Sequence, residues 1–342
     1  MISISFQIMT IKRWLDNEVS LDPLRNLKIA VIGYGIQGAA QASNMKDSGL
    51  DVCVGLRPNG KTWAKAQNDN HNVKVVSEAV KDSDIVHILI PDMEQEEAFK
   101  AEIAPHLTEN KTISFSHGAA IHWKWIDPPK NIDVVMIAPK GPGQRVRELY
   151  LDGFGTPSLV AVHQDHTGKA WDKALALAKS IGSTRPGVLE TTFKEEVETD
   201  WFGEQVDLCG GVHQMILKSF ETLVEAGYQP EIAYFECLHE LKLIVDLVQK
   251  YGITGMYNRV SETARYGGLS RGKRVIDKDT KAKMKEVLSE IQSGQFATEW
   301  VSNYKKDNKS AFSVMLQELE NHEIERVGKD LRRMMWPEEK VE

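Results

Sequence analysis

The chain has 342 residues, with 42 Lys and Arg against 49 Asp and Glu, a formal net charge of −7, and 42% hydrophobic residues. This composition is typical of globular proteins, and at ~100–200 residues per domain the length predicts two domains. The acidic balance provides no basic surface for a phosphate backbone, and no segment approaches the ~18–20 consecutive apolar residues of a membrane span. Nucleic-acid binding and membrane insertion are therefore excluded as expected primary functions.

The three cysteines, Cys53, Cys209 and Cys237, are far apart and show no zinc-site spacing. They are expected to be free thiols in a reducing compartment. The first ten residues lack a basic region and a small-residue cleavage site, so we expect no secretory signal there, and Met9 is a second candidate start. Together these features predict a cytoplasmic protein.

Short β-branched runs alternate with stretches of helix length in the first half of the chain. This alternation is typical of β-α-β units and predicts a Rossmann-type α/β domain with a parallel sheet. The predicted strands cover residues 28–33, 51–55, 85–90, 112–115, 134–137 and 158–162. We expect His87, inside one of the apolar runs, to be a hydrogen-bonded core histidine rather than a ligand.

The second half has apolar residues at three- and four-residue spacing, which indicates an all-α domain. The predicted helices cover residues 206–226, 230–251, 279–292 and 312–335. The pattern changes after residue 187, which places the domain boundary near residues 186–192. We therefore expect a dinucleotide-binding domain over 1–190 and a helical domain over 191–342.

A glycine-rich loop follows the first predicted strand. Gly33, Gly35 and Gly38 stand in the order G-x-G-x-x-G and precede a helix-compatible stretch. The missing side chains permit a tight turn and close backbone approach, and the helix N-terminus offers N–H groups to a pyrophosphate. This context predicts a dinucleotide site, and the alternative is a glycine turn without a ligand.

The segment after the second predicted strand distinguishes between cofactors. NAD sites usually place Asp or Glu there to accept from the ribose 2′-hydroxyl. This chain has Arg57, Lys61 and Thr62 instead, which suit a 2′-phosphate. NADPH is therefore favoured over NADH, which is left open, and the alternative interpretation is a solvated basic loop.

Two pairs of acids in the second half stand four residues apart, Asp200 with Glu204 and Glu236 with Glu240. On α-helices each pair projects from one face, and four carboxylates balance two divalent cations. Oxygen ligands fit hard ions such as Mg²⁺. Exposed helix acids are the simpler alternative. Glu236 and His239 also match the E-x-x-H spacing of di-iron bundles, but a second such motif is missing from the sequence.

Several motifs along the chain together resemble the ketol-acid reductoisomerase family, also called acetohydroxyacid isomeroreductases, in the short, class I form. They occur in family order between about residues 28 and 335. The matching segments are Gly33-Tyr-Gly-Ile-Gln-Gly38, Pro91-Asp-Met-Glu-Gln95, Ser116-His-Gly118, Ala138-Pro-Lys-Gly-Pro-Gly143, Val162-His-Gln-Asp165, Thr191-Thr-Phe-Lys-Glu-Glu196, Asp200-x-x-Gly-Glu204-Gln and Glu236-x-x-x-Glu240.

The resemblance implies conversion of 2-acetolactate or 2-aceto-2-hydroxybutyrate to 2,3-dihydroxy acids, by magnesium-assisted alkyl migration and hydride transfer from NADPH, in branched-chain amino acid synthesis. It also implies a knotted helical domain and a homodimer or higher homo-oligomer whose sites are completed across the interface. No family match covers residues 1–20. Gly60 stands where a phosphate-binding serine is common in the family.

The resemblance also assigns roles to residues. It implies that the four acids hold two Mg²⁺, with Asp200 bridging both ions, that Ser261 contacts the substrate carboxylate, and that His117 and Lys140 belong to the catalytic site. By residue type, Glu240 is our candidate proton relay. Without the family, the favoured interpretation of His117 is a packing or hydrogen-bonding residue. The expected cofactor contacts are Gly33, Tyr34, Gly35, Ile36, Gln37, Gly38, Arg57, Gly60, Lys61, Thr62, Asp92, Gln95 and Gly143.

Two other functions are left open by the residues themselves. A simple β-hydroxyacid or imine reductase would share the nicotinamide domain and the helical domain but would need no divalent metal. A non-catalytic nucleotide-binding regulator would keep the fold without turnover, because a fold alone does not establish activity. The paired metal acids favour the isomeroreductase over both.

Overall fold

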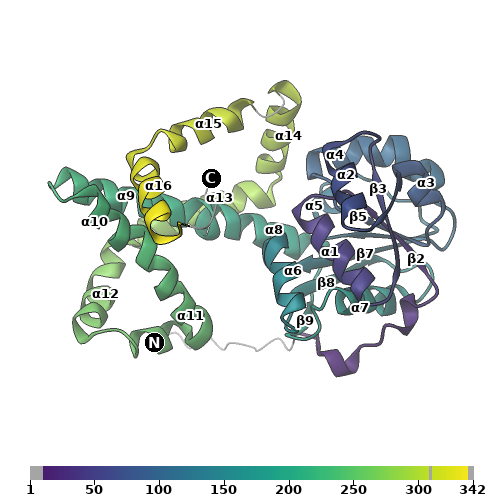
Figure 1. Ribbon diagram of the computed structural model, residues 1–342, viewed down its shortest axis with the longest axis horizontal. Coiled ribbons are helices and arrows are strands. Elements are labelled where there is room, and N and C mark those ends of the chain that lie inside the picture. The colour runs from purple at the N-terminus through teal and green to yellow at the C-terminus, as the bar shows by residue number, and fades with distance from the viewer. Residues whose placement is uncertain (1–10, 308–309, 338–342) are drawn as a thin grey trace. The chain divides into compact units, whose positions relative to one another are not determined.

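The computed structural model describes residues 11–307 and 310–337 and divides into two units, Met1–Val197 and Glu198–Glu342 (Figure 1). The boundary falls within helix α8 (Phe193–Gly203). The first unit contains the sheet, and the second is helical. The expectations about residues 1–10, that they form no signal and that Met9 is a candidate start, lie outside the described residues.

Nine strands form one sheet in the described part of the first unit, in the order β1-β9-β8-β7-β6-β5-β2-β3-β4. From β4 to β7 all neighbours are parallel, which gives the strand order of a Rossmann fold with its switch point between β2 and β5. The bounds are Arg13–Trp14 (β1), Lys28–Ile32 (β2), Asp51–Leu56 (β3), Asn72–Val75 (β4), Ile85–Ile88 (β5), Thr112–Phe115 (β6), Asp133–Pro139 (β7), Ser158–Gln164 (β8) and Val188–Glu190 (β9).

All six predicted strands are present, so the Rossmann-type α/β class is confirmed. The prediction of a parallel sheet is wrong at β8, which pairs with β7 in the antiparallel direction. The connection between them contains a helix of nine residues and then Gly153 (φ +78°) and Gly155 (φ +116°). Glycine adopts such left-handed conformations without a Cβ clash, which lets the chain turn sharply before β8.

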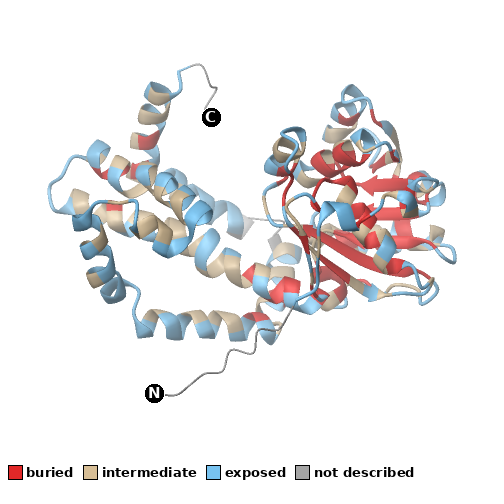
Figure 2. Cartoon of the chain, turned by 90° about the horizontal axis from the view of Figure 1, so that it is seen from below, coloured by how far each residue is buried: buried red, intermediate tan, exposed pale blue. Residues whose placement is uncertain are grey.

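Helices cover both faces of this sheet and bury it (Figure 2). On one face α1 and α7 pack through small residues such as Ala42 and Ala174 against Val31 and Val54. On the other face α3 and α5 pack against Ile32 and Ile113. The helices of this unit are Ile36–Asp47 (α1), Lys61–Asn68 (α2), Val76–Lys81 (α3), Asp92–Ala98 (α4), Ala119–His122 (α5), Gly143–Leu151 (α6) and Ala170–Ser180 (α7).

The second unit is all-α, as predicted, and few of its described residues are buried (Figure 2). Its small core contains Phe220, Ala233, Tyr234 and Ile324. No described helix is both long enough and apolar enough to cross a membrane. The helices after α8 are Gly210–Glu225 (α9), Pro230–Tyr234 (α10), Glu240–Tyr257 (α11), Glu262–Val275 (α12), Lys278–Gln292 (α13), Gln295–Asp307 (α14), Ser310–Glu320 (α15) and Glu323–Met335 (α16).

One helix prediction in this unit is wrong. The stretch 312–335 is not a single helix, because α15 ends at Glu320 and α16 begins at Glu323. His322 caps the new helix, with its Nδ1 accepting the backbone N–H of Ile324 at 3.2 Å. The apolar positions on either side of the break, Leu319 and Ile324, are only five residues apart, and this small shift in spacing did not reveal the break.

Candidate active site

The glycine loop connects β2 to α1 at the switch point of the sheet. Gly33 has φ +103°, and a Cβ there would lie 2.7 Å from the carbonyl oxygen of Leu89. A Cβ on Gly38 would lie 2.3 Å from the Gly33 carbonyl oxygen, whereas one on Gly35 would meet nothing within 4 Å. The outer glycines therefore permit close packing, and Gly35 leaves open space beside the N-terminus of α1. This cradle fits a pyrophosphate.

Side chains of the loop point in different directions. Tyr34 is buried, and its hydroxyl donates to Asp69 Oδ2 at 2.8 Å, so only its backbone is available to a cofactor. Burial, together with this bond, raises the pKa of Tyr34. Ile36 is 72% exposed. Gln37 donates from Nε2 to the carbonyl oxygen of Gly141 at 3.0 Å, which ties the loop to the segment after β7.

That segment approaches the glycine loop closely. A Cβ on Gly143 would lie 2.5 Å from the carbonyl carbon and oxygen of Ile36, so only glycine fits at this position without a shift. At the carboxyl end of β5, on the same side of β2 as β7, Gln95 is buried and donates from Nε2 to Ile90 O and Asp92 Oδ1, both at 3.0 Å. Gln95 thus orders the turn between β5 and α4.

The residues that follow β3 lie at the same edge of the sheet as the glycine loop. Arg57 follows the last residue of β3 and makes an ion pair with Glu94 Oε2 at 3.0 Å. Gly60 is the residue before α2, and Lys61 and Thr62 are the first residues of that helix. The structure thus places the predicted cofactor residues on the loops at the carboxyl ends of β2, β3 and β5 and on the first turns of the helices that follow them, with Gly143 beside the glycine loop.

A buried carboxylate, Glu196 of α8, connects the segments after β6 and β7. It is 1% exposed and accepts from the Gly118 N–H at 2.9 Å, from Lys140 Nζ at 2.8 Å and from His117 Nδ1 at 3.1 Å. Burial acts to raise the pKa of Glu196, but His117 and Lys140 outweigh it and hold the pKa at about 2. Glu196 is therefore charged, and it fixes the orientation of both side chains.

Close packing makes this arrangement possible. A Cβ on Gly118 would lie 2.7 Å from the carbonyl oxygen of Phe193, so glycine is needed for α8 to lie against the turn. Sequence reasoning assigned His117 and Lys140 to the site but missed Glu196. The available signal was an acid four residues before Asp200 in a stretch with apolar neighbours.

The predicted metal acids and Ser261 belong to the second unit. Asp200 lies on α8, Glu204 begins a π-helical turn (Glu204–Leu208), and Glu236 lies in another (Phe235–His239) directly before Glu240, the first residue of α11. Ser261 caps α12, its Oγ accepting from the Ala264 N–H at 3.1 Å.

Within the second unit, no three described His, Cys, Asp or Glu side chains come close enough together to hold an ion. The unit therefore does not by itself gather Glu204, Glu236 and Glu240 into one group. Their donor atoms are nonetheless all carboxylate oxygens, which is the chemistry that Mg²⁺ prefers. The set fits the expected metal in chemical type.

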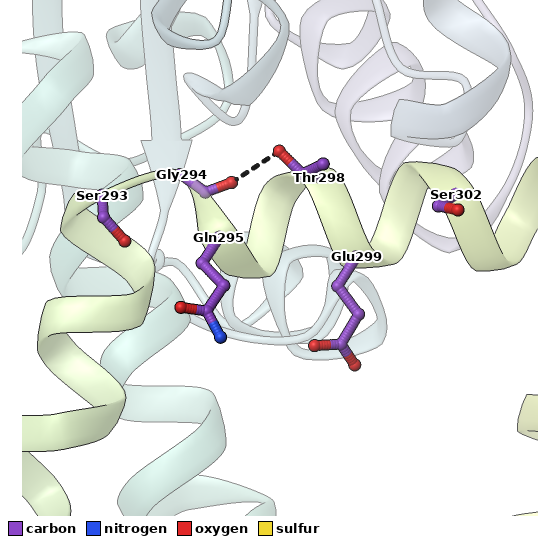
Figure 3. Close-up of a pocket in the computed structure, with 6 residues that line it drawn as sticks. All are labelled: Ser293, Gly294, Gln295, Thr298, Glu299 and Ser302. Carbon is purple, nitrogen blue, oxygen red and sulfur yellow. Dashed lines mark hydrogen bonds between the residues drawn. The ribbon is translucent and has the colours of Figure 1, made fainter.

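A pocket elsewhere in the second unit contains none of the predicted metal acids (Figure 3). It lies where α13 ends and α14 begins, and its Thr298 hydroxyl donates to the Gly294 carbonyl oxygen at 2.9 Å. Glu299 is its single charged residue. The lining residues are Ser293, Gly294, Gln295, Thr298, Glu299 and Ser302, none of which is a predicted site residue.

Comparisons with known proteins agree with this geometry. Two family models match: the acetohydroxy acid isomeroreductase NADPH-binding domain over residues 23–187 and the ketol-acid reductoisomerase C-terminal domain over 193–336. Proteins named ketol-acid reductoisomerase (NADP(+)) from Cenarchaeum symbiosum and Nitrosopumilus maritimus are each 62% identical over 325 residues, covering 95% of this chain and 98% of theirs.

A solved structure is similar along almost the whole chain. It is described as an NADH-preferring ketol-acid reductoisomerase from an uncultured archean, is 44% identical, and has a TM-score of 0.92 over 94% of this chain and 99% of that one. Both domains, their order and their full length are thus accounted for by one family. The chain belongs to the ketol-acid reductoisomerase family.

Proposed function

We propose that this chain is a magnesium- and NADPH-dependent ketol-acid reductoisomerase, which converts 2-acetolactate or 2-aceto-2-hydroxybutyrate to 2,3-dihydroxy acids in branched-chain amino acid synthesis. Membership of the family supports this function. The observation that carries it is the buried Glu196, which holds His117 and Lys140 at the carboxyl end of the sheet that bears the glycine loop.

The N-terminal unit supplies the cofactor site. Backbone N–H groups at the start of α1 face the space that Gly35 leaves open, and such groups bind a pyrophosphate. Arg57, Lys61 and Thr62 lie where the adenosine ribose of a dinucleotide is expected, after the strand next to β2. These positions also support the further proposed contacts at Gly60, Asp92, Gln95 and Gly143.

Asp200, Glu204, Glu236 and Glu240 are the residues that would hold two Mg²⁺. When bound, the ions would polarise the substrate carbonyl and stabilise the negative charge that develops on its oxygen as the alkyl group moves, and NADPH would supply the hydride. Four carboxylates and two divalent cations together carry no net charge. This neutrality lowers the free-energy cost of burying the acids and the ions in a protein interior. Ser261 is the proposed contact to the substrate carboxylate.

The protein's own groups position the reactants and handle protons. Lys140 is an ammonium with three N–H donors, one of which goes to Glu196, so it offers a cation at a fixed place in the site. His117 is oriented by the same carboxylate, which accepts from its Nδ1. We assign Lys140 the role of assisting proton movement and Glu240 that of a proton relay.

We also propose that two copies of the chain pair through their helical units. The second unit leaves many large apolar side chains more than half exposed, including Leu243, Val245 and Ile253 of α11 and Leu269 of α12. Monomeric proteins rarely expose contiguous apolar surface on this scale. Because one unit does not gather the four acids, a second copy that supplies some of them would complete the metal site.

The direct test follows NADPH oxidation at 340 nm with purified protein and 2-acetolactate, with and without Mg²⁺. We expect oxidation that requires Mg²⁺ and falls by at least 10²-fold in Asp200→Asn, because a neutral amide is a poor ligand for a hard cation. Asp207→Asn, an acid on the neighbouring π-helical turn, is the matched control and retains activity. Metal-independent oxidation would instead identify a simple reductase.

A further inference from the structure

The ion pair between Arg57 and Glu94 lies where the cofactor's adenosine ribose is expected. Arg57 directly follows β3, and Glu94 is in the first turn of α4, which follows β5. Strands β3 and β5 pair with opposite edges of β2. The 3.0 Å contact from Arg57 Nη2 to Glu94 Oε2 therefore joins the two loops on either side of the glycine loop.

This pair changes what Arg57 offers to a cofactor. A guanidinium at the end of this strand accommodates a 2′-phosphate, but here it already donates to a carboxylate. A bound 2′-phosphate must either share Arg57 with Glu94 or displace it, and in both cases it lies near a like charge. Both arrangements weaken phosphate binding relative to an unpaired arginine.

The same carboxylate favours the cofactor that lacks the phosphate. NAD sites normally present Asp or Glu at the end of the second strand to accept from the ribose 2′-hydroxyl. In this chain the segment there, residues 56–60, contains no acid. Glu94 brings a carboxylate to Arg57 from the neighbouring α4, and 30% of its side chain remains accessible.

We propose that Glu94 is a specificity-determining residue that reduces the preference for NADPH over NADH by engaging Arg57 and by offering a carboxylate to the ribose 2′-hydroxyl. This inference rests on one part of the proposed function, the binding of a nicotinamide dinucleotide at the glycine loop. It concerns binding and not turnover, so it is tested without substrate or metal. A failure of the isomeroreductase activity would leave this test intact.

The experiment measures the dissociation constants of NADPH and NADH by the fluorescence of the reduced nicotinamide, in the full chain and in Glu94→Gln. We expect Glu94→Gln to strengthen the preference for NADPH, so that the dissociation constant of NADH divided by that of NADPH rises by about tenfold. This is the effect of removing one negative charge from near a doubly charged phosphate. Because both side chains of the pair are partly exposed, the melting temperature is expected to stay within a few degrees.

Two further variants separate the proposal from simpler explanations. Glu97→Gln removes the same charge from an exposed position on the same helix and should leave the ratio within twofold of the parent. In an Arg57→Gln background, Glu94→Gln should raise the ratio by less than it does in the parent, because the competition for Arg57 is gone and only the carboxylate's own effects on the 2′-phosphate and the 2′-hydroxyl are left. A ratio unchanged in Glu94→Gln, or raised equally in Glu97→Gln, would overturn the assignment of specificity to Glu94.

Discussion

Glu196 shows how much of the site depends on one side chain. Its three donors, His117, Gly118 and Lys140, are 79, 78 and 56 residues away in sequence. Local patterning carries no information about partners at such separations, so the position of Glu196 four residues before Asp200 was its one local signal and did not identify its partners. The paired acids that spacing did single out are local by nature, and their grouping is still a prediction.

Replacing Glu196 by Gln is expected to lower kcat by about 10²–10³-fold, because Lys140 and His117 lose the charge that orients them. The dissociation constant of NADPH should change little, since the groups that donate to Glu196, on His117, Gly118 and Lys140, belong to the segments after β6 and β7 and not to the glycine loop. Steady-state kinetics and cofactor fluorescence provide the two readouts. Glu195→Gln, on an exposed neighbour, is the control, and equal losses in both variants would refute the assignment.

Gly38 and Gly35 are expected to respond differently to alanine. The Cβ of Gly38→Ala would lie 2.3 Å from a backbone oxygen, so we expect a loss of about 1–3 kcal/mol in the free energy of unfolding. Gly35→Ala meets no protein atom within 4 Å, so stability should be kept while NADPH binding weakens at least tenfold. Urea titration and cofactor fluorescence check both. Unimpaired NADPH binding by Gly35→Ala would show that the cofactor lies elsewhere.

At the scale of elements, the sequence predicts the sheet well because buried parallel strands are β-branched runs. The strands it missed, β1, β4 and β9, are short or polar. The expected end of the helix over 230–251 coincides with a break inside α11, where Gly252 has φ +74°. The antiparallel return of β8 and the break at His322 depend on turns and caps, which apolar spacing does not record.

His87 links three elements by buried hydrogen bonds, and the expectation of a satisfied core histidine is confirmed. Its Nε2 lies 2.8 Å from Gln41 Oε1 of α1, and its Nδ1 lies 2.9 Å from Ser114 Oγ of β6. Complete burial lowers the pKa of His87 to about 4. The folded protein therefore keeps this ring neutral at pH values where the unfolded chain, with a pKa near 6.5, binds a proton.

This difference predicts how stability depends on pH. The depressed pKa of His87 makes the free energy of unfolding fall as the pH drops from about 6.5 towards 4, by about 2–3 kcal/mol between pH 7 and 4.5. Urea titrations at both pH values measure it. In His87→Gln the protein should be less stable at pH 7. Its free energy of unfolding should, however, fall by about 2–3 kcal/mol less than that of the parent between pH 7 and 4.5. Identical acid losses in parent and variant would contradict the neutral, buried state.

At the scale of the whole molecule, the apolar surface of the helical unit predicts self-association. We expect a solution mass at least twice the 38.5 kDa of one chain, measured by light scattering after size exclusion. Leu243→Lys, at a side chain that is 52% exposed, should shift the protein towards single chains and abolish magnesium-dependent turnover. Leu151→Lys, at a side chain 63% exposed in the first unit, should keep at least two chains. A fully active single chain would refute a site completed by pairing.

The proposed reaction is distinguished from simple reduction by the carbon skeleton of the product. The decisive measurement is the proton NMR spectrum of the product formed from 2-acetolactate, NADPH and Mg²⁺. Isomeroreduction moves a methyl group from C2 to C3, so both methyl groups end on C3 beside a hydroxyl and give two singlets. We predict that pattern. One singlet and one doublet, from methyl groups left on C2 and C3, would show reduction without migration and contradict the account.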